Sequence, residues 1–546
     1  MTRRSPPADI SLSAFFAFKS GMGQFRPLAS TTVSVDSGMA GRIAPILARP
    51  TGAPTGAPEG RSHAGWLMMR PMWMLRLVAF LVVLALSAGA YGAESEALPE
   101  LGDASSAIVS PEMERRIGEM FLKQVRSSLP TVRDEILKYY VSTQLMQLAQ
   151  YSELREAVLS TVLIDSPDIN AFAAPGGVVG INLGLMVHAL DVHEYGSVVA
   201  HELAHLSQRH FARGIEAQQR GAMPMLVGFI AAAILAMTAG GDAGMAAMAG
   251  TQAAAMDNQL RYSRGREQEA DRIGLNTVVR AGLDPHGMAR MFQRMQRAFR
   301  FTERPPEFLL THPITETRIA DARNQAARYP VVQVQGSRDY QLMRMRALVH
   351  FAETPSRAMA EARDTDGTPD ARAYRLALAR SGVGEHVEAV IGMADLFEAD
   401  PGSILLSASY ADALIEAGRY DAAVRHLSHQ LVINPDNQPF AMLYAKALSG
   451  QERHAAAQEV LERQSRVHAN DVEVWHDLAE VAGLAGDIVQ VHRARAEFFA
   501  LFGDYRKAIQ HLEYARGLIE PDNIRSMAGL TQRILDLRTE LESLKS

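Results

Sequence analysis

The chain has 546 residues and a formal net charge of -6, with 47% hydrophobic and 21% charged residues. A chain of this length and ordinary composition has room for about two to four folded domains. Its small negative charge gives no indication of nucleic acid as a partner. The sequence contains no cysteine, which excludes disulfide bonds, thiol catalysis and cysteine-ligated zinc. Histidine and carboxylate side chains are therefore the metal ligands available.

The first 67 residues are predicted to be disordered. Residues 49–58 are a tract of Pro, Gly, Ala, Thr and Arg without a periodic apolar face, and such a composition does not build a packed core. Several methionines follow, and we expect translation to start between Met68 and Met74. On this interpretation, residues 1–67 are an extension in front of the true start.

Residues 68–93 have the pattern of a secretory signal peptide. A basic flank that ends at Arg76 precedes an apolar core at residues 77–86, and small residues follow. Cleavage is expected after Ala90 or Ala93, and the mature chain would then be exported. The alternative is an uncleaved membrane anchor.

A first domain is expected at residues 95–330, and it opens with helical apolar spacing at residues 112–127 and 132–151. Two short β-like segments then flank a Pro-Gly-Gly turn, which predicts a β-hairpin. An exposed strand edge beside an active-site cleft could hold an extended peptide through main-chain hydrogen bonds. A purely structural hairpin is the alternative. The candidate residues of this substrate edge are Asn170, Phe172, Pro175, Gly176 and Gly177.

Residues 197–207 contain the pattern His-Glu-x-x-His. On a helix, His201 and His205 project from one face about one turn apart, which suits two imidazole nitrogens that bind one zinc ion. Glu202 lies beside that face, where its carboxylate can act on a water at the metal without being a ligand. We expect this helix to start at residues 196–197. Three nearby histidines are interpreted as surface residues: His188, His193 and His210.

A third ligand is predicted in the segment at residues 262–274. Glu267 and Asp271 are four apart and share a helical face, whereas Glu269 points roughly the other way. This arrangement lets Glu267 bind zinc while Asp271 accepts the outer N–H of a ligand histidine and fixes the orientation of its ring. The small side chain of Ala270 would let the two metal-bearing helices approach closely.

An apolar, methionine-rich insert lies between the two motifs, at residues 222–256. Residues 225–239 carry no charge, but a helix of ~15 residues spans only ~22 Å. That is short of the ~30 Å hydrocarbon core of a membrane. We predict a helical hairpin at the cleft that is packed down or touches a membrane surface or an unfolded client. An ordinary core element is the alternative.

The segment at residues 310–319 places His312 before a proline and Arg318 on a following helix. His312 could stabilise an oxyanion. It could instead occupy the open metal position and restrain activity, because three protein ligands leave a zinc site open and a fourth closes it. A helix-start turn with an exposed histidine is the remaining interpretation. Arg318 is included as a candidate regulatory or oxyanion residue.

A repeat of 34 residues follows, in a second domain expected at residues 338–546. Ala389, Ala423 and Ala457 are equally spaced, and the segment around Gly418 is echoed around Gly503. Small residues where paired helices cross and glycine at the turn between them are typical of tetratricopeptide repeats. We predict about four repeats plus partial ones, with irregular spacing after Asp487, stacked into a solenoid with a concave surface for clients.

Three motifs together, at residues 170–177, 201–205 and 267–271, resemble the zinc metallopeptidases that include HtpX and the CAAX prenyl proteases. The soluble periplasmic members with a helical-repeat tail, of the β-barrel assembly-enhancing type, are the most similar. The resemblance implies one Zn²⁺ per chain held by His201, His205 and Glu267, with Glu202 catalytic. It also implies the periplasm, unfolded or misassembled outer-membrane proteins as clients, and contact of the repeats with the barrel-assembly machinery.

The expected fold is mainly α: an α+β zincin-like metallopeptidase domain with a small β-hairpin or sheet, followed by an α-solenoid of tetratricopeptide repeats. The expected function is that of an exported zinc endopeptidase in which Glu202 moves the proton of the attacking water. Asp271 is the second candidate catalytic residue, because it would orient a ligand histidine. One alternative is a periplasmic chaperone with a latched, weakly active site. Another is a membrane-associated scaffold that depends on the insert, with peripheral membrane contact.

Overall fold

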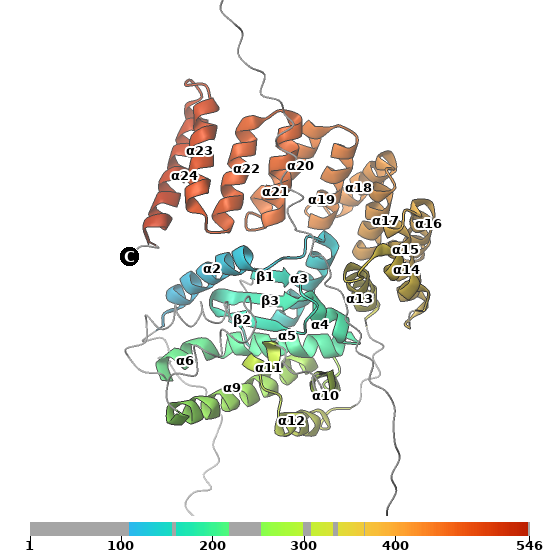
Figure 1. Cartoon of the computed structure of the whole chain (residues 1–546), viewed down its shortest axis with the longest axis vertical. Coiled ribbons are helices and arrows are strands. Elements are labelled where there is room, and N and C mark those ends of the chain that lie inside the picture. Colours follow the sequence, from blue (N-terminus) through green and yellow to red (C-terminus); the bar gives the residue numbers. More distant parts are fainter. Residues whose placement is uncertain are drawn as a thin grey trace, which may run out of the picture. The chain divides into compact units, whose positions relative to one another are not determined.

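The structure is a computed structural model, and it describes residues 109–155, 160–217, 253–298, 307–330, 337–364 and 366–543. The predictions for residues 1–67, for the signal peptide at residues 68–93 and for most of the insert at residues 222–256 lie outside these ranges. The described part is mainly helical with one small sheet, as expected (Figure 1).

A three-stranded sheet forms the β part of the first domain. Its strands are β1 (Ser160–Ile164), β2 (Ala171–Ala174) and β3 (Val178–Asn182), in the order β1-β3-β2. The central strand β3 is parallel to β1 and antiparallel to β2. The predicted hairpin is thus confirmed as β2 and β3, joined by a 3₁₀ turn (Pro175–Gly177). Gly176 and Gly177 have φ values of 72° and 78°, which glycine adopts without steric cost.

Helix α2 (Pro111–Ser128) holds the hairpin turn in place. A side chain at Gly118 would lie only 2.2 Å from the carbonyl oxygen of Pro175, so the helix and the turn meet through backbone atoms. The ring of Phe172 packs edge-on against Phe121, with the ring centroids 5.5 Å apart. The same ring fills the space above Gly180 in the neighbouring strand. Packing against α2 and within the sheet therefore explains Gly118, Gly180 and Phe172.

Helix α5 (Val192–Ser207) carries the His-Glu motif, and its expected start at residues 196–197 is wrong. The helix begins at Val192, because the Asp191 carboxylate accepts hydrogen bonds from the N–H groups of His193 and Glu194 at 3.0 and 2.8 Å. Gly196 lies inside the helix, where a Cβ atom would come within 2.6 Å of the Leu283 side chain. Close packing against a neighbouring segment therefore explains this glycine.

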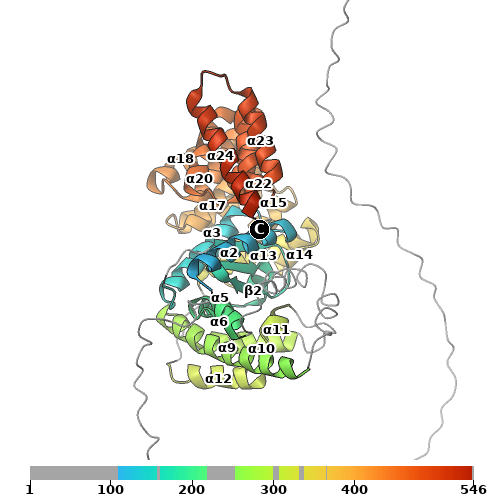
Figure 2. The same cartoon turned by 90° about the vertical axis from the view of Figure 1, so that its left-hand side faces the viewer.

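Helix α9 (Ala253–Arg280) lies beside α5 (Figures 1 and 2). The two helices are close because small residues line the contact: Ala270 is fully buried, and a Cβ atom at Gly274 would approach the His201 backbone nitrogen to 3.0 Å. The other helices of this domain are α3 (Glu135–Gln150), α4 (Leu183–His188), α6 (His210–Ala217), α10 (His286–Ala298), α11 (Glu307–Thr311) and α12 (Glu316–Ala326).

The rest of the described chain consists of consecutive helices, as the 34-residue period predicts (Figure 1). The repeated alanines, Ala389, Ala423 and Ala457, are at most 1% exposed. The expected irregularity after Asp487 has a visible cause: tight glycine turns occur at both Gly486 and Gly503, only half a repeat apart. The helices are α13 (Arg338–His350), α14 (Pro355–Arg363), α15 (Pro369–Gly382), α16 (His386–Ala399), α17 (Ile404–Glu416), α18 (Tyr420–Ile433), α19 (Gln438–Gly450), α20 (His454–Val467), α21 (Val472–Ala485), α22 (Ile488–Leu501), α23 (Tyr505–Leu518) and α24 (Ile524–Ser543).

Side chains of the first domain and of the repeats contact each other directly. The hydroxyl of Tyr340 on α13 lies 3.1 and 3.0 Å from the carbonyl oxygens of Met186 and Ala189. On α3, Lys138 donates to Glu135 and to Asp471, which caps α21, at 3.0–3.1 Å. A single apolar cluster extends from α3, α5 and the sheet through α13 to α19. None of the described helices has the length and apolar content that a membrane crossing needs.

Candidate metal centre

Four side chains from three segments point their donor atoms at one another. His201 and His205 of α5 have Nε2 atoms 3.1 Å apart. Glu267 of α9 places Oε2 3.4 Å from His201 Nε2 and Oε1 3.4 Å from His205 Nε2. His312, just after α11, has its Nδ1 atom 3.1 Å from Glu267 Oε2 and 3.4 Å from His201 Nε2. All four donor atoms lie within 4.8 Å of one another.

This spacing fits a tetrahedral metal ion. Ligand bonds of ~2.0–2.1 Å at tetrahedral angles put the ligand atoms about 3.3 Å apart, and the observed contacts are 3.1–3.4 Å. Three imidazole nitrogens and one carboxylate oxygen are the donor set that suits zinc among the common divalent ions. The residues present therefore fit a bound metal.

The protonation of two donors, Glu267 and His205, favours a cation at this place. Burial alone would raise the pKa of Glu267, but the neighbouring His312 and His201 lower it well below its usual range. Burial lowers the pKa of His205, and the charges of His201 and His312 lower it further. For His201, burial acts downward, but hydrogen bonds to Asp271 and Glu267 raise its pKa to about 9. A metal that binds Nε2 of His201 must displace this proton.

Glu202 lies in the wall of the same site. Its side chain is 1% exposed, and burial raises its pKa. Its Oε1 atom, 3.7 Å from His312 Nε2, is buried without a hydrogen-bond partner among the described residues. A hydrogen bond from the backbone of Ala173 in β2 reaches the carboxylate. Glu202 is therefore a carboxylate with a raised affinity for a proton, next to the donor atoms and beside a strand edge.

Asp271 and Arg318 support the donors from behind. Asp271 Oδ1 is 3.0 Å from His201 Nδ1, the nitrogen that faces away from the other donors. Arg318 donates to both Asp271 oxygens at 2.7 and 2.8 Å, and its Nη1 lies 3.0 Å from Glu267 Oε2. Burial would raise the pKa of Asp271, but Arg318 and His201 lower it. This geometry favours a positioning role for Arg318 over direct contact with a substrate oxyanion.

Two of the histidines interpreted as surface residues are buried. His193 is 2% exposed and accepts a hydrogen bond from the Asp284 N–H through Nδ1, at 3.1 Å. His210 is 4% exposed, with Nδ1 2.9 Å from His205 Nδ1 and Nε2 3.1 Å from Glu269 Oε2. The surface interpretation is wrong for both, and it holds for His188, which is exposed. Spacing along one helix could not indicate the role of His210, because α5 ends before it.

The predicted substrate edge depends on the main chain rather than on its side chains. Asn170 is buried, and Phe172 packs on α2. Pro175, Gly176 and Gly177 form the turn against the same helix. Strand β2 pairs with β3 on one side and contacts α5, where the backbone of Ala173 reaches Glu202. The strand thus runs beside the carboxylate that the chemistry would use.

A second group of acidic and histidine side chains lies on α21, but an arginine already occupies it. Glu473, His476 and Asp477 have ligand atoms close enough to one another for a metal. Arg133 Nε donates to Glu473 at 2.7 Å, and its Nη2 lies 3.1 Å from His476 Nδ1. This group is an ion-pair network between Arg133, which precedes α3, and α21.

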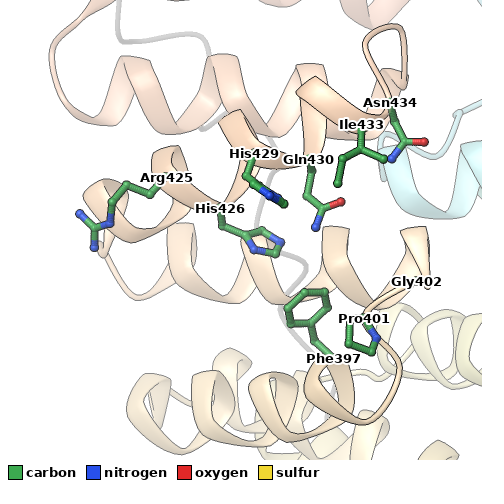
Figure 3. A pocket seen from close by; sticks show the side chains of 9 residues that line it. All are labelled: Phe397, Pro401, Gly402, Arg425, His426, His429, Gln430, Ile433 and Asn434. Carbon is green, nitrogen blue, oxygen red and sulfur yellow. The ribbon is translucent and has the colours of Figure 1, made fainter.

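A pocket with a volume of about 610 Å³ lies between α16 and α18 of the repeats and includes none of the metal-donor residues (Figure 3). Its floor holds the rings of Phe397 and His426, whose centroids are 5.0 Å apart. Figure 3 shows Arg425 pointing away from these rings. The pocket is a feature of the repeat surface and takes no part in the metal centre.

Fold and site together define a metallopeptidase joined to a helical repeat, and comparison with known proteins agrees. The model of peptidase family M48 matches residues 136–326, and a tetratricopeptide-repeat model matches residues 414–481. The β-barrel assembly-enhancing protease of Escherichia coli K12 is 31% identical over 465 residues, which cover 84% of this chain and 94% of that protein. The Yersinia pestis protease of the same name is 32% identical over 81% of this chain and 91% of its own length.

A more distant relative matches a shorter part of the chain. The mitochondrial metalloendopeptidase OMA1 of Bos taurus is 32% identical over 160 residues, which cover 28% of this chain and 29% of that protein. The chain belongs to the M48 family of metal-dependent peptidases, in the group of the β-barrel assembly-enhancing proteases.

Proposed function

We propose that the chain is a zinc endopeptidase with one Zn²⁺ held by His201, His205 and Glu267. The observation that carries this proposal is the set of mutual distances of 3.1–3.4 Å among their donor atoms, beside the buried carboxylate of Glu202. Asp271 holds the ring of His201 through Nδ1. A role as zinc ligands explains why a carboxylate and two imidazoles converge in a buried place.

The proposed chemistry is hydrolysis of a peptide bond. A metal bound at these donors would act as a Lewis acid toward the peptide carbonyl and would acidify water. Glu202 takes the proton from the attacking water and passes it to the leaving amine. Its buried position and raised pKa suit both steps, because the carboxylate must gain the proton and then release it near neutral pH. The main chain of β2 would hold the substrate in an extended form.

We propose that His312 is a fourth ligand that restrains the enzyme. Its Nδ1 atom is as close to His201 Nε2 as Glu267 Oε2 is, at 3.4 Å in both pairs. Its ring stacks on Phe308, with the centroids 4.9 Å apart, and its backbone N–H bonds to the Phe308 carbonyl at 2.7 Å. Four protein ligands close a zinc site to water. Activity would then require this segment to move.

His312→Ala is expected to raise the rate of proteolysis severalfold while the zinc content stays at one ion per chain. Removal of the fourth donor opens a coordination position, and the other three donors still hold the metal. The measurement is casein-type digestion together with metal analysis of the same sample, with the surface variant His188→Ala as control. A loss of activity of about 10²–10³-fold would instead identify His312 as the oxyanion donor.

We propose further that the chain works in the periplasm, with unfolded or misassembled outer-membrane β-barrel proteins as clients. Support comes from the relatives named β-barrel assembly-enhancing protease, since 94% of the Escherichia coli protein is covered by the match. The match therefore includes the repeats, which suit client or partner binding and could contact the barrel-assembly machinery. A chaperone with a latched protease site is the second candidate, because four donors converge here instead of three.

Crosslinking in cells with the Glu202→Gln variant tests the clients directly. An inactive enzyme that still binds should accumulate crosslinks to outer-membrane β-barrel proteins. Digestion of an unfolded β-barrel protein, with and without a zinc chelator, separates the two candidates. Chelator-sensitive cleavage supports the peptidase, whereas prevention of aggregation without cleavage supports the chaperone. Crosslinks to unrelated proteins alone would contradict the proposed clients.

A further inference from the structure

The chain turns between α5 and α6 at a strained residue. Arg209 has a φ of 48°, and among the described non-glycine residues only Glu452 shares a positive φ. The Arg209 side chain is fastened: Nε lies 3.2 Å from Glu114 Oε2, and Nη2 donates to the Val109 carbonyl at 2.7 Å. Such strain persists where surrounding contacts enforce it, and it is common at functional sites. The turn brings His210 against His205.

The contacts of His210 form a chain that starts at a proposed zinc ligand. His205 Nε2 faces the other donors, so its lone pair is the one a metal would take, and the ring proton is left on Nδ1. That Nδ1–H is 2.9 Å from His210 Nδ1, which must accept. The His210 proton is then on Nε2, which donates to Glu269 at 3.1 Å. One arrangement of protons satisfies every contact.

We propose that His210 is a positioning residue of the metal centre. It fixes the ring of His205 by a hydrogen bond and links that ring to the carboxylate of Glu269. The ring of His201 is positioned by a carboxylate directly, because its Nδ1 lies 3.0 Å from Asp271 Oδ1. The acidic residues at positions 267–271 of α9 then serve the same site: Glu267 binds the metal, and Asp271 and Glu269 orient the two histidines. This inference rests on the proposed zinc site.

Two arginines hold this series of hydrogen bonds in place. Arg213 Nη1 lies 3.2 Å from Glu269 Oε2, and Arg266 Nη1 donates to the backbone carbonyl of His210 at 2.8 Å. Glu269 is 35% exposed, whereas His210 is 4% exposed. The buried histidine is thus held through its side chain and through its backbone. The series of hydrogen bonds ends at the protein surface, at Glu269.

The test compares His210→Phe with His210→Asn in the full-length protein. Phenylalanine keeps a ring of similar size without an acceptor, whereas the amide oxygen of asparagine can accept from His205 Nδ1–H. We expect His210→Phe to weaken zinc binding by roughly 10–100-fold in competition with a chelator, and to shift the visible absorption of the Co²⁺-loaded protein. His210→Asn should restore most of the affinity and the original Co²⁺ spectrum.

His193→Phe is the matched control, because His193 is also buried on α5 but contacts Asp284 instead of a donor. It should bind zinc with unchanged affinity. The proposal is overturned if His210→Phe keeps both affinity and spectrum, or if His210→Asn is as weak as His210→Phe. If His210→Phe does not fold, Glu269→Leu replaces it. We expect a smaller loss of zinc affinity in this variant, and an unchanged Co²⁺ spectrum would contradict the proposal.

His205→Ala distinguishes this proposal from the proposed zinc site. Full zinc binding in His205→Ala would contradict the site itself. If His205→Ala loses zinc binding and His210→Phe keeps it, the proposed zinc site stands and the proposed role of His210 is contradicted.

Discussion

Glu202→Gln is expected to lower the rate of peptide hydrolysis by about 10²–10⁴-fold, the usual contribution of a general base, while zinc content stays unchanged. The amide matches the carboxylate in size but cannot accept a proton. Glu202 is not among the four converging donors, so its replacement leaves the donor set intact. The measurement is initial-rate proteolysis of an unfolded protein, with metal analysis of the same preparation.

Glu194→Gln is the matched control for this prediction. Glu194 is also 1% exposed and lies on α5, but its carboxylate pairs with Arg294 at 2.9 Å instead of facing the donors. We expect this control to lose thermal stability and to keep its catalytic rate well below the melting temperature. Full activity in Glu202→Gln, with zinc present, would assign the proton transfer to another group.

Local helical geometry is what made the donor residues predictable. His201 and His205 are four residues apart, as are Glu267 and Asp271, and one turn of helix puts each pair on one face. The repeats were predictable for a similar reason, because a 34-residue period in small residues and turn glycines is written directly in the sequence. Such patterns depend on near neighbours in the chain.

Features that depend on distant contacts were not predictable. The position of His210 follows from the strained turn at Arg209, which is held by Glu114 and Val109, about 100 residues earlier. Arg318 was identified as a candidate, but its partner Asp271 is 47 residues away and on another helix. The start of α5 differs from the expected one for a local and a distant reason. The local reason is the cap that Asp191 provides, and the distant one is the packing of Gly196 against Leu283.

Arg318→Met is the second change for which we expect a large effect, this time on stability. Arg318 is 3% exposed and holds two buried carboxylates, Asp271 and Glu267, on α9. Its loss leaves them buried without this cation, at a cost of about 3–5 kcal/mol. With a shift of about 2–4 °C per kcal/mol, the melting temperature of the metal-free protein should fall by roughly 10 °C, as measured by calorimetry.

The effect of Arg318→Met should depend on pH in a defined direction. Because Arg318 and His201 depress the pKa of Asp271 in the folded state, the ionised carboxylate contributes stability above its unfolded pKa. That stability is lost as the pH falls through the folded value. The difference between the wild type and Arg318→Met should therefore be large at neutral pH and should narrow in acid.

Arg357→Met is the control for Arg318→Met, since the pair of Arg357 with Glu361 is an exposed one, with Arg357 62% exposed. Little change is expected there, because solvent screens such pairs. Arg318→Lys should recover only part of the stability, since one ammonium group cannot replace the two parallel bonds to Asp271 together with the bond to the Pro313 carbonyl. A melting temperature of Arg318→Met equal to that of the wild type, or a difference that persists unchanged in acid, would show that α9 is held in place by packing alone.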